Sequence, residues 1–467
     1  MKSPSQYIDD LKTKETSIAP LVIFRILFGL LMAFGAIRFI FSGWIEKLYL
    51  EPDFFFKFFG FEWVHVPQSA WLLYGLHLLI ATSAIGIALG WKYRWAAILF
   101  FLSFSYAEMM DATNYLNHYY LVILVAFLMI FLPAHRSFSI DAFINKSIRQ
   151  NNVPRLYLAV LQWQVGLVYV FAGLAKVNYD WLVHAMPLAV WLPARTDIPG
   201  LGLLFEQPWA PFLMSWAGAF YDLFIVFLLT SKRWWKAGYL LVIIFHLMTK
   251  VLFNIGMFPY IMICFTTIFI PVVYHQRSLK FLRKLFGKIR SVTILTPPVN
   301  ASIPKVAPIS SRTKSLSLVF MFFIIIQLIA PLRHLLYSGS VHWNEEGYRW
   351  SWRVMLLEKA GTAFFTVEDL RSGRKFEVEN DLFLTAYQEK QMAFQPDFIL
   401  QFAHHLNQHY MKKLGSEDLR ITVRSRVSLN GRKSQTLIDP HTDLTKIHNT
   451  WLKKKWILPY EPQITAL

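Results

Sequence analysis

Residues 156–181 read LYLAVLQWQVGLVYVFAGLAKVNYDW, an apolar run that meets a polar segment at Lys176. The run from Leu156 to Ala175 has the length of about 20 residues that a helix needs to cross a membrane. An amine at the rim of such a helix is held partly out of water, which disfavours its charged form. A neutral amine can act as a base or a nucleophile, so Lys176 is a candidate catalytic residue. The alternative is a lysine that extends its ammonium group from the helix end to the membrane surface.

The composition extends this apolar pattern to most of the chain. Hydrophobic residues make up 55% of the 467 residues, and 41 Phe and 17 Trp are spread through long apolar stretches. Candidate membrane-spanning runs begin near Ile18, Trp71, Trp95, His118, Leu156, Pro211, Gly238, Phe258 and Leu316. The sequence therefore predicts a polytopic α-helical membrane protein with about nine transmembrane helices within residues 1–336. The first run has no convincing cleavage site and is expected to be a retained helix.

The formal net charge is +18, and its distribution argues against nucleic-acid binding. Basic residues cluster in short loops between the apolar runs, as the positive-inside rule for membrane proteins predicts. The clusters are Lys92 and Arg94; Arg136, Lys146, Arg149 and Arg155; Lys232, Arg233 and Lys236; and Arg277 to Arg290. All of them lie on one side if the N-terminus is cytoplasmic. Apolar residues at helical spacing in His275–Val292 predict an interfacial helix on the anionic inner leaflet.

Residues 338–467 then lie in the periplasm, outside the cell or in a lumen, and are predicted to form a small mixed α/β domain packed on the membrane part. Thr362–Val378 has the pattern of two strands around a Ser-Gly turn, and Asn430-Gly431 between alternating runs signals a hairpin. Apolar residues at helical spacing between Pro396 and Leu414 complete a β-β-α-β-β order. A linker rich in Pro and Ser, Thr296–Ser311, precedes the last span.

The only cysteine of the chain, Cys264, lies in a predicted span. Burial in apolar surroundings disfavours a thiolate nucleophile at this position. The exported domain consequently has no disulfide, which favours a bacterial inner membrane, with the ER membrane as the alternative for a eukaryotic source.

Three polar clusters lie on the outer side in this topology: Asp111–His118, the segment that Lys176 opens, and Asn254–Phe258. His246 and Lys250 come shortly before the third cluster. Ionisable groups are costly to place in a membrane, so these clusters are expected to converge on one pocket.

Structural alternatives exist for several of these residues. Arg25 and Asp222, in the first and sixth predicted spans, are candidates for a polar pair that orients helices. His246 could be a core histidine bonded to a carbonyl group, and His118 could cap a helix. The histidines lack the carboxylate pattern of a metal site, so no metal is predicted.

Several motifs resemble those of the vitamin K-dependent γ-glutamyl carboxylases, in the order of that family and along almost the whole chain. The motifs are FRILFG (24–29), DATNYLNHY (111–119), FAGLAKVNYDW (171–181), Phe245-His246, NIGMF (254–258), WNEEGYRWSW (343–352) and DPHTD (439–443). The resemblance is to a bacterial-type member with an HTTM domain.

The resemblance implies a membrane-bound peptidyl-glutamate 4-carboxylase, a carbon–carbon lyase that uses vitamin K hydroquinone, O2 and CO2. It converts glutamyl side chains of a peptide or protein to γ-carboxyglutamate while the hydroquinone becomes its epoxide. The catalytic base of the family falls on Lys176, and its histidine–asparagine pair falls on His118 and Asn117, which would hydrogen-bond a developing oxyanion. The remaining implied site residues are His246 for catalysis and Trp343, Tyr348, Ser351, Trp352, Asn254 and Met257 for substrate or quinone binding. Membrane lipid and a quinone reductase that regenerates the hydroquinone are the implied partners.

This chemistry explains why a lysine suffices as the base. The γ-hydrogen of a glutamate is far too weakly acidic for any side-chain base, whereas a quinol O–H is about as acidic as a phenol. Lys176 is therefore expected to act on the hydroquinone alone, which with O2 supplies the stronger base that removes the carbon-bound proton. A water-poor pocket in the membrane protects that base and the resulting carbanion from protonation.

Three departures from the family pattern bear on substrate and base. Leu356 and Leu357 occupy the stretch where the family has a histidine, so the glutamyl carboxylate is expected to be placed differently. Ala175 stands where animal members have a second lysine. The chain ends soon after its Asp-Pro motif, so propeptide recognition is expected to be reduced, altered or absent.

Two alternatives to the coupled carboxylase stay open. One is a quinol-epoxidising homologue that acts on another substrate or is uncoupled from carboxylation. The other is a membrane transporter with an exported binding domain, although the sequence shows no clear internal repeat.

Overall fold

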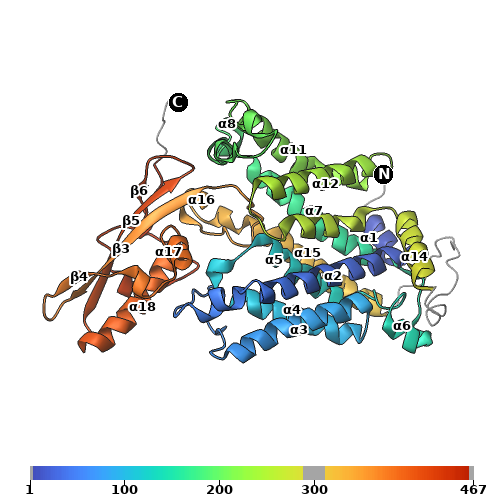
Figure 1. Ribbon diagram of the computed structural model, residues 1–467, viewed down its shortest axis with the longest axis horizontal. Helices are drawn as coiled ribbons and strands as arrows, with labels where there is room; N and C mark the ends of the chain where they lie inside the picture. Colours follow the sequence, from blue (N-terminus) through green and yellow to red (C-terminus); the bar gives the residue numbers. More distant parts are fainter. Residues whose placement is uncertain (1–3, 288–310, 462–467) are drawn as a thin grey trace.

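A bundle of long helices lies beside a smaller domain with a β-sheet, as a computed structural model of the chain shows (Figure 1). The structure describes residues 4–287 and 311–461. Each predicted apolar run lies in one of the long bundle helices: α2 (Ala19–Phe41), α3 (Ala70–Leu89), α4 (Tyr93–Met109), α5 (Asn117–Phe131), α7 (Leu156–Lys176), α11 (Ala210–Thr230), α12 (Trp235–Leu252), α13 (Phe258–Thr266) and α15 (Ser311–Ile329). The polytopic helical fold is therefore confirmed.

The predicted count of nine spans is not confirmed. Within the described residues, six helices are long and apolar enough to cross a membrane, and a seventh span results if the bent pair that begins at Phe258 is one span. Helix α4 has 17 residues, α5 has 15 and α13 has 9. Residues 110–116 separate α4 from α5, so both helices are short, which the apolar composition of the two runs did not reveal.

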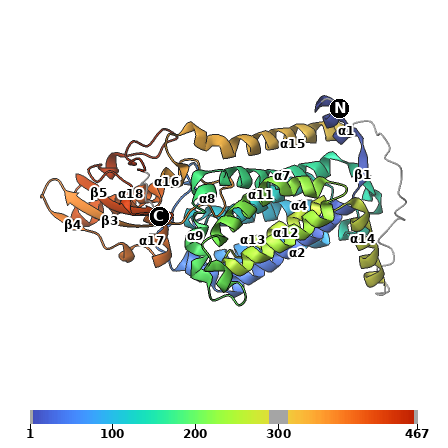
Figure 2. The same ribbon diagram turned by 90° about the horizontal axis from the view of Figure 1, so that it is seen from above.

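Helix α14 (Val272–Gly287) follows α13 and a 3-10 turn, and its axis is bent by 109° from theirs. It lies at the end of the bundle that is farthest from the sheet domain (Figures 1 and 2). Leu279 is buried while Arg277 and Lys280 are exposed, so the helix is amphipathic as predicted. Its place at a membrane surface stays a prediction. Residues 288–292 of the predicted helix and nearly all of the linker Thr296–Ser311 lie outside the described residues.

Helix α7, which contains the apolar run Leu156–Ala175, is the most enclosed candidate span in the described chain, with 67% of its apolar window buried. Its packing on α11 requires a glycine, because a Cβ at Gly173 would lie 2.8 Å from the backbone nitrogen of Leu223. The helix ends where Asn178 caps the short helix α8 (Tyr179–Val183) by accepting a hydrogen bond from the backbone N–H of Trp181 at 3.0 Å. This ending places Lys176 in the last turn of α7.

The C-terminal region is the mixed α/β fold that the sequence predicts. Its strands form an antiparallel sheet of order β4-β3-β5-β6, and its helices α17 and α18 pack on β3 and β5. The bounds are β3 (Lys359–Asp369), β4 (Lys375–Glu377), α17 (Ala386–Met392), α18 (Pro396–Leu414), β5 (Leu419–Leu429) and β6 (Gln435–Thr436). Helix α17 was not predicted, although Thr385 and Gln388 form a capping box at its start.

Short elements connect these parts. They are α1 (Pro4–Thr13), β1 (Glu15–Ser17), α6 (Ile140–Ile144), β2 (Asn152–Pro154), α9 (Leu188–Trp191), α10 (Gly202–Phe205) and α16 (Val341–Asn344). Strands β1 and β2 pair with each other in a separate antiparallel ladder.

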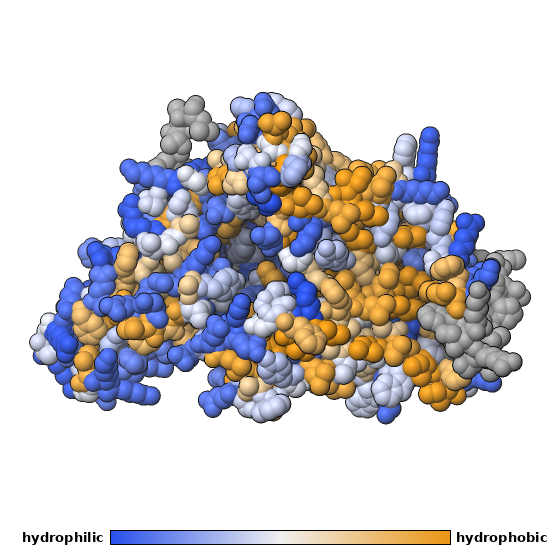
Figure 3. All heavy atoms as spheres, viewed as in Figure 1, coloured by the Kyte–Doolittle hydropathy of each residue, from blue (hydrophilic) through white to orange (hydrophobic). Residues whose placement is uncertain are grey.

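Apolar side chains remain exposed along the bundle. Figure 3 shows orange residues along the flank of the helices, whereas blue residues predominate at the outer edge of the sheet domain. Trp71, Phe227 and Phe322, on three different helices, are all exposed. Such a surface is expected where helices face lipid.

Candidate active site

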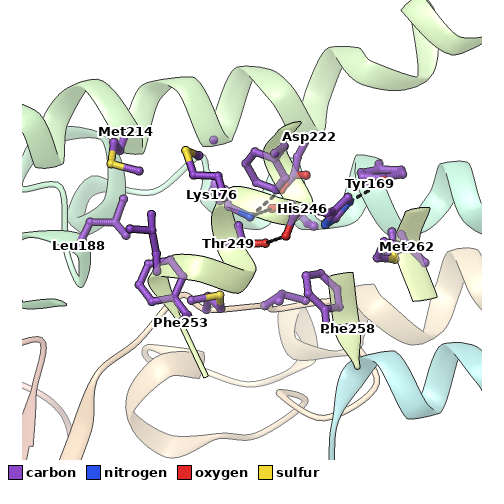
Figure 4. A pocket seen from close by; sticks show the side chains of 18 of the residues that line it. Tyr169, Lys176, Leu188, Met214, Asp222, His246, Thr249, Phe253, Phe258 and Met262 are labelled. Atoms are coloured by element: carbon purple, nitrogen blue, oxygen red, sulfur yellow. Dashed lines mark hydrogen bonds and ion pairs between the residues drawn. The ribbon is translucent and has the colours of Figure 1, made fainter. Parts of the chain in front are cut away.

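A largely apolar cavity lies among α7, α11, α12 and α13, and Figure 4 shows it from close by. It encloses about 770 Å³ of empty space, part of which opens to the surroundings. Its apolar wall includes Val168, Ala172, Trp181, Leu188, Met214, Leu252, Phe253, Phe258 and Met262. Lys176, Asp222, His246 and Thr249 supply the main polar groups, and Val354 and Met355 enter from the C-terminal region.

Lys176 and Asp222 form an ion pair at this cavity. The distance from Lys176 Nζ to Asp222 Oδ2 is 2.6 Å, and each side chain is 8% exposed (Figure 4). The ring of Trp181 lies 5.3 Å from Nζ. A carboxylate at this distance favours the ammonium form, whereas burial disfavours it. The lysine that the sequence analysis treats as an isolated amine therefore has a carboxylate partner.

The predicted pair of Arg25 and Asp222 is wrong. Asp222 contacts Lys176, while Arg25 donates a hydrogen bond from Nη2 to the backbone oxygen of Phe138 at 2.6 Å. Phe138 precedes α6, at the end of the bundle away from the sheet domain (Figure 1). The sequence cannot reveal whether two charged groups on separate helices lie at the same depth in the bundle.

His246 is oriented by a tyrosine. Its Nε2 lies 2.9 Å from the hydroxyl of Tyr169, and its Nδ1 is buried with no hydrogen-bond partner among the described residues. Thr249 donates to the backbone oxygen of His246 at 2.9 Å. The ring is therefore not bonded to a carbonyl group as in the core-histidine alternative, and one nitrogen stays available to a ligand.

His118 is outside the lining of this cavity, but its ring is near that of Phe258, which is part of the lining. Ring centroids are 5.7 Å apart for His118 and Phe258 and 5.4 Å apart for His246 and Phe258. The Nε2 of His118 is buried and has no hydrogen-bond partner in the described part of the chain. The start of α5 shows no side-chain cap, so His118 does not act as one.

Asn117 contacts the C-terminal region instead of the cavity. Its Nδ2 donates to the backbone oxygen of Arg353 at 3.2 Å, and its Oδ1 accepts from the hydroxyl of Tyr115 at 2.9 Å. Asn117 therefore fixes the chain that leads to Val354 and Met355 in the cavity wall.

The predicted binding residues of the C-terminal region surround this segment but do not line the cavity. Trp343 lies in the core of the sheet domain, and Tyr348 donates to the backbone oxygen of Arg353 at 3.3 Å. Ser351 donates to the backbone oxygen of Tyr348, and the ring of Trp352 stacks on Tyr120 inside the bundle at 5.0 Å. These four residues thus position the segment that closes the cavity.

The segment also has a strained backbone. Trp350, Trp352 and Met355 have φ values of +60°, +58° and +55°, a region that bulky residues rarely adopt. Such strain persists only where surrounding contacts enforce it, and it is concentrated at functional sites.

Asn254 and Met257 lie apart from the cavity at Lys176. Asn254 is exposed, and Met257 lines a separate cavity together with His77, Glu108 and Tyr119. The structure thus brings Lys176, Asp222 and His246 together at one cavity, and His118 contacts the wall residue Phe258. Asn254 and Met257 do not line this cavity.

Sequence reasoning missed Tyr169, Thr249 and Met355. Tyr169 lies seven residues before Lys176 on α7, two turns away on the same face, which was an available signal. Thr249 and Met355 carry no comparable signal, because their roles depend on how α12 and the C-terminal segment pack.

The sheet domain makes hydrogen bonds to Asp180 in α8, directly after the end of α7. Both guanidinium nitrogens Nη1 and Nη2 of Arg432 donate to Asp180, at 2.8 and 2.5 Å, and Asn430 Nδ2 donates to it at 2.8 Å. Burial alone would raise the pKa of Asp180, but these hydrogen bonds and the charge of Arg432 hold it below the usual value. The hairpin turn predicted at Asn430-Gly431 therefore contacts α8, four residues beyond Lys176.

Metal ligands are not clustered in the described ranges, 4–287 and 311–461. There, no group of three or more His, Cys, Asp or Glu side chains could hold a metal ion.

Comparison with known families identifies both parts of the chain. The HTTM domain matches residues 13–273, more than half of the chain, and the lumenal domain of vitamin K-dependent gamma-carboxylase matches residues 312–463. The chain belongs to the vitamin K-dependent γ-carboxylase family. As a family member it is a carboxylase-like membrane protein of a vitamin K-using class. No solved structure matches it.

The cavity of this carboxylase family member fits a quinol. An apolar wall suits the ring system, and the Lys176–Asp222 pair and the unpaired Nδ1 of His246 suit its oxygens. These residues are the ones that would hold vitamin K hydroquinone.

Proposed function

We propose that this protein carboxylates glutamyl side chains with CO2 while it oxygenates vitamin K hydroquinone to the epoxide. The observation that carries the proposal is the buried pair of Lys176 and Asp222, with 2.6 Å between Nζ and Oδ2, in the wall of an apolar cavity. Burial and an opposite charge act on one amine here, and such combinations are typical of catalytic groups.

The pair acts as one base. At rest it holds a single proton between Lys176 Nζ and Asp222 Oδ2, which are within hydrogen-bond distance. When that proton lies on Oδ2, Nζ is a neutral amine whose lone pair can accept a proton from a hydroxyl group in the cavity. After the transfer the pair holds two protons, one on each residue. By taking this proton, Asp222 allows Lys176 to be neutral while the amine keeps a hydrogen-bonded partner.

The histidines supply hydrogen bonds to oxygen. Tyr169 fixes the orientation of the His246 ring at 2.9 Å, which leaves Nδ1 for an oxygen of the bound ring. The ring of Phe258 is near both histidines, and we propose that its movement lets His118 reach the same space. Held by these residues, vitamin K hydroquinone would supply, together with O2, the strong base that the removal of the γ-hydrogen needs.

The enclosure protects this chemistry from water. The lining is apolar apart from the groups named above, and Val354 and Met355 close the side next to the sheet domain. Exclusion of water strengthens electrostatic interactions in the cavity and prevents protonation of a carbanion.

The test is a two-product assay on the purified protein. Vitamin K hydroquinone, a Glu-containing peptide and labelled bicarbonate are supplied, and epoxide and peptide-bound label are both measured. We expect both products, and only epoxide if the Glu is replaced by Gln. Epoxide without fixed label on any Glu peptide would favour the uncoupled homologue. Neither product from a folded protein would remove the carboxylase proposal and leave the transporter alternative.

A further inference from the structure

A buried cation that has no carboxylate partner within residues 4–287 and 311–461 lies next to the cavity wall in sequence. Arg353 is 8% exposed and directly precedes Val354 in the chain. Its Nη2 lies 2.8 Å from His334 Nε2, and its Nη1 lies 3.3 Å from His342 Nε2. Its Nε is buried with no hydrogen-bond partner, and no carboxylate forms an ion pair with Arg353, among the residues that the structure describes.

The two histidines do not supply a negative charge. A ring nitrogen that accepts a hydrogen bond from a guanidinium group is unprotonated, so each of the two rings is neutral. Burial, and then the charge of Arg353, lower the pKa of His342 to about 4. The cluster therefore carries the single positive charge of Arg353.

Three other cations of the C-terminal region with buried or half-buried side chains are paired. Lys359 Nζ lies 2.9 Å from Glu345, Arg349 lies 2.5 Å from Asp397, and Arg432 lies 2.5 Å from Asp180. Buried charges are normally paired in this way because removal from water is costly. Arg353 departs from that pattern, so an anion is the partner that its site is missing.

The position of Arg353 identifies the kind of anion. Its backbone oxygen accepts hydrogen bonds from Asn117 and Tyr348, and the next two residues line the cavity at Lys176. Arg353 does not itself line the cavity, but it belongs to the same short segment as the two wall residues, with its guanidinium group on His334 and His342. The planar fork of an arginine binds both oxygens of a carboxylate.

We propose that Arg353, supported by His334 and His342, binds the carboxylate of the glutamyl side chain that is to be carboxylated. The assignment rests on the proposed function. It gives the carboxylate a donor in a chain that has Leu356 and Leu357 where the family has a histidine. Loss of the γ-proton places further negative charge on the carboxylate oxygens, and a fixed cation stabilises charge that develops there.

The test measures binding without vitamin K, so that no turnover is needed. A Glu-containing pentapeptide and the same peptide with Gln are titrated into the purified full-length protein in nanodiscs by calorimetry. We expect the wild type to bind the Glu peptide about tenfold more tightly or better, as for a charge-assisted bidentate pair. Arg353→Gln should remove this preference, and Arg353→Lys should keep part of it. Arg371→Gln, which removes an exposed charge of the same domain, is the matched control and should leave the preference unchanged.

A second arm does not depend on the folding of a variant. Glutarate should displace the Glu peptide from the wild-type protein, whereas glutaramide at the same concentration should not. Equal affinity of the wild type for the two peptides, or a preference that survives in folded Arg353→Gln, would overturn the assignment. Wild-type protein that prefers Glu through Arg353 but makes neither epoxide nor fixed label would keep this site and remove the carboxylase function.

Discussion

In the proposed base Asp222 takes the proton that Lys176 gives up, so its replacement tests the pair directly. Asp222→Asn keeps the shape of the side chain but removes the carboxylate 2.6 Å from Nζ. We expect hydroquinone oxidation to fall by about 10²–10⁴-fold, the usual contribution of a positioned acid–base group. Asp222→Glu should retain part of the rate, because a carboxylate remains. Initial rates of hydroquinone consumption measure the effect, and a folded Asp222→Asn variant with the wild-type rate would remove Asp222 from the base.

Single residues were predictable from the sequence to different degrees. Lys176 stood out because a polar segment directly follows a span-length apolar run, and Asp222 because it is an acid inside one. Their contact was not predictable, since no periodicity relates residues on separate helices. Arg353 was overlooked for a related reason: its lack of a carboxylate partner is a property of the folded chain.

The α7–α8 junction depends on the hairpin of β5 and β6 through Asp180. The folded-state pKa of Asp180 lies below the unfolded value of about 3.9, so its ionised form stabilises the fold above that pH. That contribution is lost as the pH falls through the lower folded value. Asp180→Asn should cost about 1 kcal/mol at pH 7, a modest value because solvent screens the partly exposed pair. Thermal melts at pH 7 and pH 3 should show a smaller difference between the two proteins at the lower pH. A difference that is the same at both pH values would contradict this role.

Elements were predicted best where a local signal marks both ends. Helix α18 has the predicted bounds Pro396–Leu414, with a proline at its first position and Gly415 after its last. The strands on either side of Ser372-Gly373 and Asn430-Gly431 are also confirmed. Helices α4 and α5 proved shorter than a full span because apolar composition alone does not locate a helix end.

The charge pattern predicts how the whole molecule is oriented across the membrane, and a labelling experiment can test this orientation. Basic helix α14 and the sheet domain lie at opposite ends of the bundle (Figures 1 and 2), and from this the positive-inside rule predicts a cytoplasmic N-terminus. In a Cys264→Ser background, Glu417→Cys should react with a membrane-impermeant thiol reagent in intact cells. Lys280→Cys, in α14, should react after permeabilisation only. The reverse pattern would contradict the orientation. The division of the chain at residues 336–338 and the bacterial inner membrane stay predictions.

In the proposed function Lys176 starts the reaction by accepting a proton at the cavity, and one comparison tests this role most directly. Epoxide formation is measured for the wild type and for Lys176→Ala, with thermal melts to establish that the variant is folded. We predict that the variant forms no detectable epoxide and that an added small primary amine restores part of the rate. Epoxide formation at the wild-type rate by folded Lys176→Ala would contradict the account.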